Sequence, residues 1–196
     1  MAHVKHLLLL LCACLLPWHL SAQDDPQTQV SFCGQSIPLD AKTVECYDRA
    51  LTDLTPLSGL SNLEVLILQY TTVTDLTPLS GLSNLEVLIL QHTAVADLSP
   101  LSTLTNLQGL DVSWTDVTDI GPLASLKNLK ELSLYLTKVP DITPLASLTN
   151  LVLLSLPRLH LVKSDDLARV AAALKRLESL EVLSDAPIDF SAFAPM

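Results

Sequence analysis

The sequence has 196 residues, of which 49% are apolar, 16% charged and only 4% aromatic, and its formal net charge is -10. An acidic surface repels the phosphate backbone, so this composition excludes DNA and RNA as partners. Beyond the N-terminus no apolar run reaches the length of about 18 residues that a membrane-spanning helix needs. These properties favour one globular domain that does not span a membrane.

The N-terminus predicts an export signal. Lys5 precedes an apolar stretch from Leu7 to Leu16, and small residues lead up to Ala22 before the chain becomes polar. We expect residues 1–22 to be a signal peptide cleaved after Ala22, which places the protein outside the cell, in a periplasm or at the cell surface. An uncleaved anchor is the alternative, but the apolar stretch is too short to cross a bilayer. Lipoprotein processing at Cys14 is a minor alternative, because the apolar run continues past it.

Two cysteines, Cys33 and Cys46, remain after such a cleavage. In an exported protein they predict one disulfide, whose loop of about 14 residues would contribute roughly 3 kcal/mol. Two reduced buried thiols are the alternative. The two histidines that remain, His92 and His160, lie far from any cysteine and from each other in sequence, so we expect neither a metal nor a cofactor.

A 22-residue period runs through the middle of the chain. Within each unit leucines recur at the same positions, for example at Leu66 and Leu68 and again at Leu88 and Leu90. This spacing is typical of leucine-rich repeats, in which Leu-x-Leu forms a short parallel strand. Each unit opens with Asp-(Leu/Ile)-x-Pro-Leu, and the five aspartates are Asp53, Asp75, Asp97, Asp119 and Asp141.

A single unit cannot bury its leucines, since a leucine contributes about 1.5 to 3 kcal/mol only when neighbours cover it. Stacked units pair their strands about 4.8 Å apart and join each leucine column into a continuous core. The prolines favour turns or 3₁₀ helix on the return segment. We therefore predict an α/β leucine-rich repeat solenoid with about six short parallel strands on its concave face, turns and 3₁₀ segments on its convex face, and a helix in its C-terminal cap.

The ends of the array depart from the period and predict caps. We assign 23–52 to an N-terminal cap, 53–161 to five repeats and 162–196 to a C-terminal cap. Cys46 aligns with a core leucine, so a bridge to Cys33 would hold the N-terminal cap over the open end of the stack. In the C-terminal cap, Ser164 is expected to cap a helix with apolar positions from Leu167 to Leu177, followed by a strand near 181–184.

The first two units share an identical stretch, because Asp53–Gln69 equals Asp75–Gln91 residue for residue. This identity indicates an internal duplication. The third and fourth units differ from them mainly at the strand positions between leucines. Variation at those positions is expected when the scaffold is constant and the surface is adjustable.

The unit Asp-Leu-Thr-Pro-Leu-Ser-Gly-Leu-Ser-Asn-Leu-Glu-Val-Leu-Ile-Leu resembles the 22-residue repeats of internalins and related exported bacterial leucine-rich repeat proteins. The resemblance covers about Val44 to Leu161 and implies protein recognition by the concave face. In that family an asparagine usually follows the strand and builds a side-chain ladder in the turn. Here a ladder of hydroxyls is expected in its place, from Thr71, Thr93, Thr115 and Thr137.

Catalytic motifs are missing from the sequence. It contains no Gly-x-Ser-x-Gly, no His-Glu-x-x-His and no glycine-rich phosphate loop, so we expect no enzymatic activity. The periodic aspartates are interpreted as caps of backbone N–H groups in the convex turns. The periodic asparagines are interpreted as turn-stabilising residues; they are Asn62, Asn84, Asn106, Asn128 and Asn150.

The aromatic residues of the predicted strand face gather in two neighbouring columns. Tyr70, His92 and Trp114 form one column, and Tyr47 and Tyr135 lie in the next. Because tyrosine and tryptophan combine a large apolar area with a polar tip, they are favoured at interfaces. We predict a binding patch from these residues together with Asp111 and Glu131. Stacking of the rings across neighbouring strands for stability alone is the alternative.

Two classes of function follow. The first is an exported interaction module, expected to be monomeric, that binds a protein or peptide, or else a glycan, through the concave face. The second is a structural, envelope-associated repeat protein without a discrete ligand. A phosphatase-regulator-like repeat scaffold is a weaker third interpretation, because the export signal disfavours it.

Overall fold

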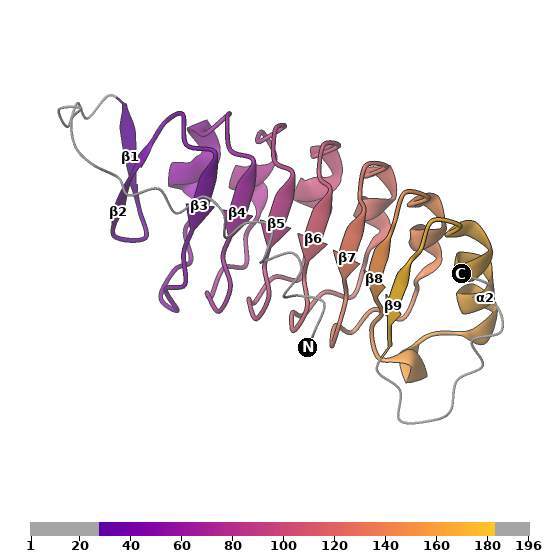
Figure 1. The fold of residues 1–196 in the computed structure, drawn as a ribbon. Coiled ribbons are helices and arrows are strands. Elements are labelled where there is room, and N and C mark those ends of the chain that lie inside the picture. The colour runs from indigo at the N-terminus through magenta and orange to yellow at the C-terminus, as the bar shows by residue number, and fades with distance from the viewer. Residues whose placement is uncertain (1–27, 183–196) are drawn as a thin grey trace.

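A computed structural model describes residues 28–182 of the chain. The predicted signal peptide, its cleavage site and the last part of the C-terminal cap lie outside these residues. Seven short strands form one parallel sheet in which each strand pairs with its neighbour in sequence (Figure 1). They are β3 (Thr43–Glu45), β4 (Val65–Ile67), β5 (Val87–Ile89), β6 (Gly109–Asp111), β7 (Glu131–Ser133), β8 (Leu153–Ser155) and β9 (Ser179–Glu181).

The register of the sheet repeats the sequence period. Leu66 pairs with Leu88, and Leu88 pairs with Leu110, so residues 22 apart lie side by side. The sheet has seven strands where about six were expected, because both caps contribute one.

Short 3₁₀ helices form the opposite, convex wall, as predicted from the periodic prolines. In each of them a proline occupies one of the first two positions, where its missing N–H leaves no hydrogen bond unmade. They span Thr55–Gly59, Thr77–Leu79, Ser99–Thr103, Gly121–Ser125 and Thr143–Ser147.

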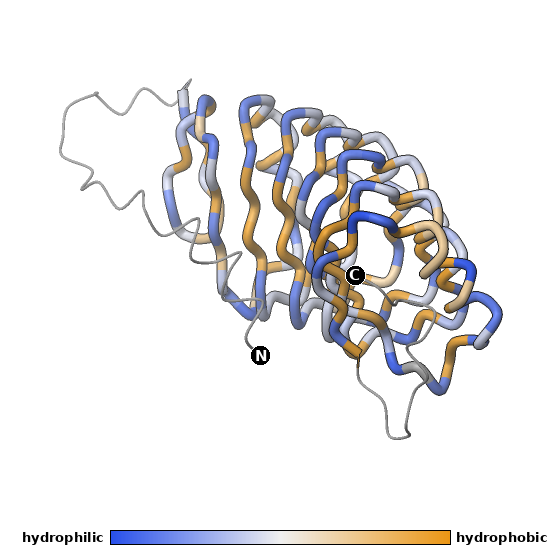
Figure 2. Tube along the Cα trace, turned by 45° about the vertical axis from the view of Figure 1, so that its right-hand side comes forward, coloured by the Kyte–Doolittle hydropathy of each residue, from blue (hydrophilic) through white to orange (hydrophobic). Residues whose placement is uncertain are grey.

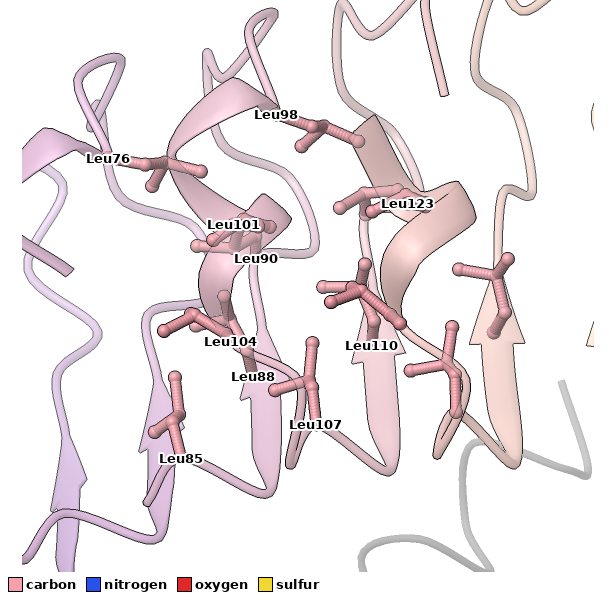
Figure 3. Packing of buried hydrophobic residues seen from close by; sticks show 14 of the residues in the cluster. Leu76, Leu85, Leu88, Leu90, Leu98, Leu101, Leu104, Leu107, Leu110 and Leu123 are labelled. Atoms are coloured by element: carbon pink, nitrogen blue, oxygen red, sulfur yellow. The ribbon is translucent and has the colours of Figure 1, made fainter. Parts of the chain in front are cut away.

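The core lies between these two walls. Leu88 and Leu90 of one strand segment and Leu101 of the following 3₁₀ helix are completely buried, and Figure 3 shows such leucines directed toward one another. In the tube of Figure 2 the apolar residues recur at corresponding places in successive turns of the solenoid. Each leucine column is therefore continuous from repeat to repeat, as the stacking argument requires.

The N-terminal cap contains a hairpin that the sequence did not predict. β1 (Gln29–Phe32) and β2 (Gln35–Pro38) pair antiparallel, and Cys33 and Gly34 form the turn with φ of 53° and 70°. Left-handed φ at both central residues matches the twist of a tight hairpin. Cys33 is joined to Cys46 by a disulfide with a Cα–Cα distance of 6.0 Å. Cys46 is buried, with 1% of its surface exposed, so the bridge holds the hairpin to the end of the leucine core, as predicted.

The C-terminal cap contains a 3₁₀ turn (Leu159–Leu161) and the helix α2 (Ser164–Ala173). The expected cap at Ser164 is wrong: Ser164 is the first helical residue, and Lys163 occupies the cap position without a side-chain hydrogen bond. The last strand also begins earlier than expected, at Ser179. Its register follows from the pairing of Leu180 with Leu154, which continues the core column through a longer final unit.

Candidate functional site: the concave face and its aromatic row

Alternation along each strand decides which side chains face away from the core. Leu66 and Leu68 are buried in the core, so Val65, Ile67 and Gln69 belong to the concave face. The parallel register places the equivalent residues of every repeat beside them. Concave residues therefore form columns that run along the solenoid, one residue per strand.

The residue that follows the last concave position adopts a left-handed backbone in four successive repeats. The φ angles are 62° at Tyr70, 56° at His92, 57° at Trp114 and 56° at Leu136. The backbone N–H of Tyr70 donates to the Gln91 carbonyl, and the equivalent bonds start from His92 and Trp114. A bulky residue in this conformation costs about 1 to 2 kcal/mol relative to glycine. These backbone hydrogen bonds between repeats hold the three ring-bearing residues in a backbone conformation that glycine would adopt with less strain.

Three rings are stacked and a fourth lies tilted beside them, and we call this set the aromatic row: Tyr70, His92, Trp114 and Tyr135. The centroids of Tyr70 and His92 are 4.9 Å apart with an interplanar angle of 16°, and those of His92 and Trp114 are 4.7 Å apart at 20°. Tyr135 lies 6.4 Å from Trp114, tilted by 59°. The two shorter spacings follow the distance between strands of about 4.8 Å. The structure thus brings together four of the seven predicted site residues.

The aromatic row is accessible although its members cover one another. Tyr70 is 44% exposed and Trp114 is 48% exposed, while His92 between them is half-buried. Stacking occupies the ring faces inside the row, so the free surface consists largely of ring edges. These edges carry positive partial charge, a tyrosine hydroxyl and an indole N–H, all of which can donate to a partner's oxygen atoms.

Asp111 lies on the concave face but is only 3% exposed. Its Oδ1 accepts a hydrogen bond from the backbone N–H of Ser113 at 2.8 Å. Burial raises the pKa of Asp111, and the bonding to Ser113 and the nearby His92 oppose the shift only in part. A buried carboxylate offers little surface to a partner, so its position supports a role in shaping the face.

Tyr47 and Glu131 lie outside the ring stack. Tyr47, two residues after β3, is 51% exposed, and its hydroxyl donates to Glu45 Oε2 at 3.0 Å. Partial burial and this hydrogen bond raise the pKa of Tyr47 to about 12. Glu131 begins β7, where it pairs with Gly109. Tyr47 precedes the aromatic row by one repeat, and Glu131 lies in the same repeat as Tyr135, at the start of its strand.

The periodic polar residues have structural roles, as interpreted from the sequence. Oδ1 of each repeat aspartate accepts the backbone N–H two residues later, for example from Thr77 to Asp75 at 2.8 Å. Nδ2 of Asn84, Asn106, Asn128 and Asn150 donates to a backbone carbonyl of the preceding repeat. These asparagines connect neighbouring repeats.

The expected ladder of threonine hydroxyls is wrong. Thr71 Oγ1 donates to the Leu68 carbonyl within its own repeat at 2.9 Å, and Thr93, Thr115 and Thr137 do the same three residues back. A threonine hydroxyl is too short to reach the next repeat from this position, whereas it reaches the carbonyl one turn earlier. The threonines therefore close each turn without linking repeats.

Within residues 28–182 no group of three or more His, Cys, Asp or Glu side chains is placed to hold a metal ion. None of the helices described there has both the length and the apolar character that crossing a membrane requires.

Comparison with known proteins finds similarity at the level of structure. No family model matches the sequence, and a search of curated proteins finds no match either. An internalin (inlF) from Listeria monocytogenes shares 30% sequence identity with a TM-score of 0.54, over 73% of this chain and 48% of its own. Internalin C2 (inlC2) from the same species shares 27% identity with a TM-score of 0.59, over 84% of this chain and 83% of its own.

A leucine-rich repeat protein from Leptospira interrogans, at 22% identity, has a TM-score of 0.56 over 71% of this chain and 36% of its own. The present chain thus spans about half of the inlF structure and about a third of the Leptospira one. These similarities confirm the leucine-rich repeat solenoid and the resemblance to internalins that the repeat motif predicted.

Proposed function

We propose that this internalin-like leucine-rich repeat protein is an exported interaction module that binds a protein or peptide through its concave face, with the aromatic row at the centre of the contact. The observation that carries the proposal is the exposed stack of Tyr70, His92 and Trp114 on a left-handed backbone. Tyrosine and tryptophan are enriched among residues that dominate binding energy. Glycine would satisfy the backbone with less strain, which favours a role for the rings themselves.

The edge-on presentation of the rings specifies the kind of contact. Ring edges and their N–H and O–H groups suit backbone carbonyls and acidic side chains of a polypeptide. Seven strands at about 4.8 Å span roughly 30 Å, enough for one small domain or a peptide.

Export is supported by the N-terminal sequence and by the pairing of Cys33 with Cys46. Intact-mass analysis of the secreted protein should place the N-terminus at Gln23 and find a mass about 2 Da below that of the reduced chain, the loss of two thiol hydrogens. A lipidated N-terminus at Cys14, or two thiols open to alkylation, would contradict this part of the proposal.

The binding experiment begins with an unbiased pull-down by the secreted protein to identify a partner. Trp114→Ala should then weaken binding of that partner by about 2 kcal/mol or more, while barely changing the melting temperature of the protein. Thr77→Ala and Ser80→Ala, on the exposed convex wall, are matched controls that should bind normally.

Two outcomes would overturn the concave-face assignment. One is normal binding by both Trp114→Ala and Tyr70→Ala together with loss of binding by the convex variants. The other is a loss of stability in the ring variants without any effect on an interaction, which would make the aromatic row a structural stack in a spacer protein.

A further inference from the structure

A groove lies along the edge of the sheet where the strands begin, away from the aromatic row at the strand ends. It has a volume of about 380 Å³, and residues directly preceding four successive strands line it: Glu86, Gln108, Lys130 and Val152. Arg176, just before β9, closes its C-terminal end. Sequence reasoning missed it because Lys130 and Arg176 are 46 positions apart and belong to no motif.

Two cations line this groove, each donating to a side-chain amide, and the carboxylate of Glu86 lines the same groove. Lys130 Nζ donates to Gln108 Oε1 at 2.8 Å, and Arg176 Nη1 donates to Asn150 Oδ1 at 2.9 Å. By contrast, Lys42 is paired with Glu64 at 2.7 Å. The neutral amide partners hold the two cations in place and leave their charge to a ligand, in a chain whose net charge is -10.

The asparagines of the groove are held in one orientation. Asn106 and Asn150 donate through Nδ2 to the carbonyls of Ser83 and Lys127, at 2.9 and 2.8 Å. This bond fixes each amide and therefore the position of its Oδ1. The two asparagines lie two strand spacings apart, roughly 10 Å, and Asn150 Oδ1 already accepts the hydrogen bond from Arg176. Glu86 adds a carboxylate acceptor at the far end. The groove thus has one cation near its middle, where Lys130 reaches Gln108, a second cation at its C-terminal end, and hydrogen-bond acceptors beside them.

We propose that this groove binds an acidic saccharide, such as a uronic or sialic acid unit. Its carboxylate and neighbouring oxygen atoms would contact Lys130 and Arg176, and its hydroxyl groups would donate to the amide oxygens and to Glu86. The volume of the groove lies near the lower end of the range for ligand sites, about 300 to 1,000 Å³, which suits one or two sugar units. A peptide fits less well, because Val152 is the one apolar side chain among the lining residues and no ring is present.

This site is independent of the proposed protein contact at the aromatic row. Titration of the secreted protein with sialyllactose and with digalacturonic acid, followed by NMR, should shift resonances of the groove, whereas neutral lactose should not. Lys130→Gln and Arg176→Gln should each lower the affinity for the acidic sugar about tenfold or more, since each removes a charge-assisted hydrogen bond.

Lys127→Gln is the matched control. It removes the same charge outside the groove, where Lys127 Nζ donates to the Ser147 carbonyl, and it should leave the affinity unchanged. Trp114→Ala should also leave sugar binding unchanged, which separates this site from the aromatic row.

The proposal is overturned if neither acid binds, if lactose binds as well as the acids, or if the two groove variants bind normally. Tighter binding of an acidic peptide than of either sugar, with the same loss in Lys130→Gln, would reassign the groove to peptides. Loss of sugar binding in Trp114→Ala but not in the groove variants would move the saccharide to the aromatic row.

Discussion

The repeats that begin at Asp53 and Asp75 differ from those that begin at Asp97 and Asp119 in the character of their concave face. On the concave face β4 presents Val65 and Ile67, and β5 repeats this apolar pair, whereas β6 presents Gly109 and Asp111. The burial of the core is the same in both pairs of repeats. Its equivalent leucines are all no more than 2% exposed: Leu66, Leu88, Leu110 and Leu132.

The convex turns of the two pairs of repeats use the same hydrogen bond. Thr77 donates to Asp75 at 2.8 Å in one pair, and Ser99 donates to Asp97 at 2.8 Å in the other. The comparison teaches that scaffold and surface are nearly separate in this molecule. Because the core and the turns carry the stability, most concave positions are free to vary. The exceptions among the described residues include the buried Ile67 and Ile89 and the buried carboxyl group of Asp111.

The largest expected effect tests the equality of the two scaffolds. Leu88→Ala and Leu110→Ala should each lower the free energy of unfolding by about 2 to 5 kcal/mol, because each leaves a cavity between stacked repeats. Chemical denaturation measures both. A large loss for one and almost none for the other would show that the drifted repeats are packed differently from the duplicated ones.

A smaller effect tests the turns that close each strand. Thr93→Val and Thr115→Val remove the hydroxyl hydrogen bonds to Leu90 and Val112, which are 2.8 and 2.6 Å long. Each should lower stability by about 1 kcal/mol, since the shape is retained but a buried carbonyl loses a donor. Thr118→Val, at an exposed position of the same repeat, should have almost no effect. Equal losses in all three variants would contradict a local role for the buried hydroxyls.

The pH dependence of stability distinguishes the buried Asp111 from the aspartates of the turns. Burial raises the pKa of Asp111, so its contribution to stability is complete below the unfolded pKa and is lost as the pH rises through the folded pKa. Hydrogen bonds from Thr77 lower the pKa of Asp75, so its contribution is present above the unfolded pKa and is lost as the pH falls through the folded pKa.

Between about pH 3 and pH 7, the contributions of Asp111 and Asp75 to stability should therefore change in opposite directions, which denaturation midpoints measure. Asp111→Asn should gain stability relative to the parent protein as the pH rises, while Asp75→Asn should flatten the loss in acid. The same pH profile for both variants would show that Asp111 is solvated like the turn aspartates.

The smallest expected effect concerns the concave surface itself. Gln91→Ala and Gln69→Ala, in the duplicated repeats, should each change stability by less than about 0.5 kcal/mol, because neither side chain belongs to the core. A loss as large as that of Leu88→Ala would reverse the assignment of inner and outer faces.

Sequence reasoning located most of the fold because the period is local and strict. The spacing of Asp75 and Leu88 predicted the turn, the strand and the buried column, and the alignment of Cys46 with a core leucine predicted the bridge to Cys33. It also placed Tyr70, His92 and Trp114 in one column, which the structure confirms as a ring stack.

The errors fall where the period stops or where a side chain has two partners within reach. The hairpin of 29–38 belongs to no repeat, and Ser164 matches the residue type of a helix cap without occupying the cap position. Thr71 occupies the place of an asparagine in the related repeats, but its shorter side chain reaches only its own turn.

The sequence by itself determined the solenoid, its register and its buried leucines, because these depend on residue spacing within one unit and on the need to cover an apolar face. Only the tertiary structure decided that Asp111 is buried, that three rings share a left-handed backbone, and that Lys130 and Arg176 meet in one groove. The physical reason is that stacking brings residues 22 or more positions apart to within about 5 to 10 Å. Burial, ring geometry and the convergence of charge depend on those neighbours, and a single repeat does not contain them.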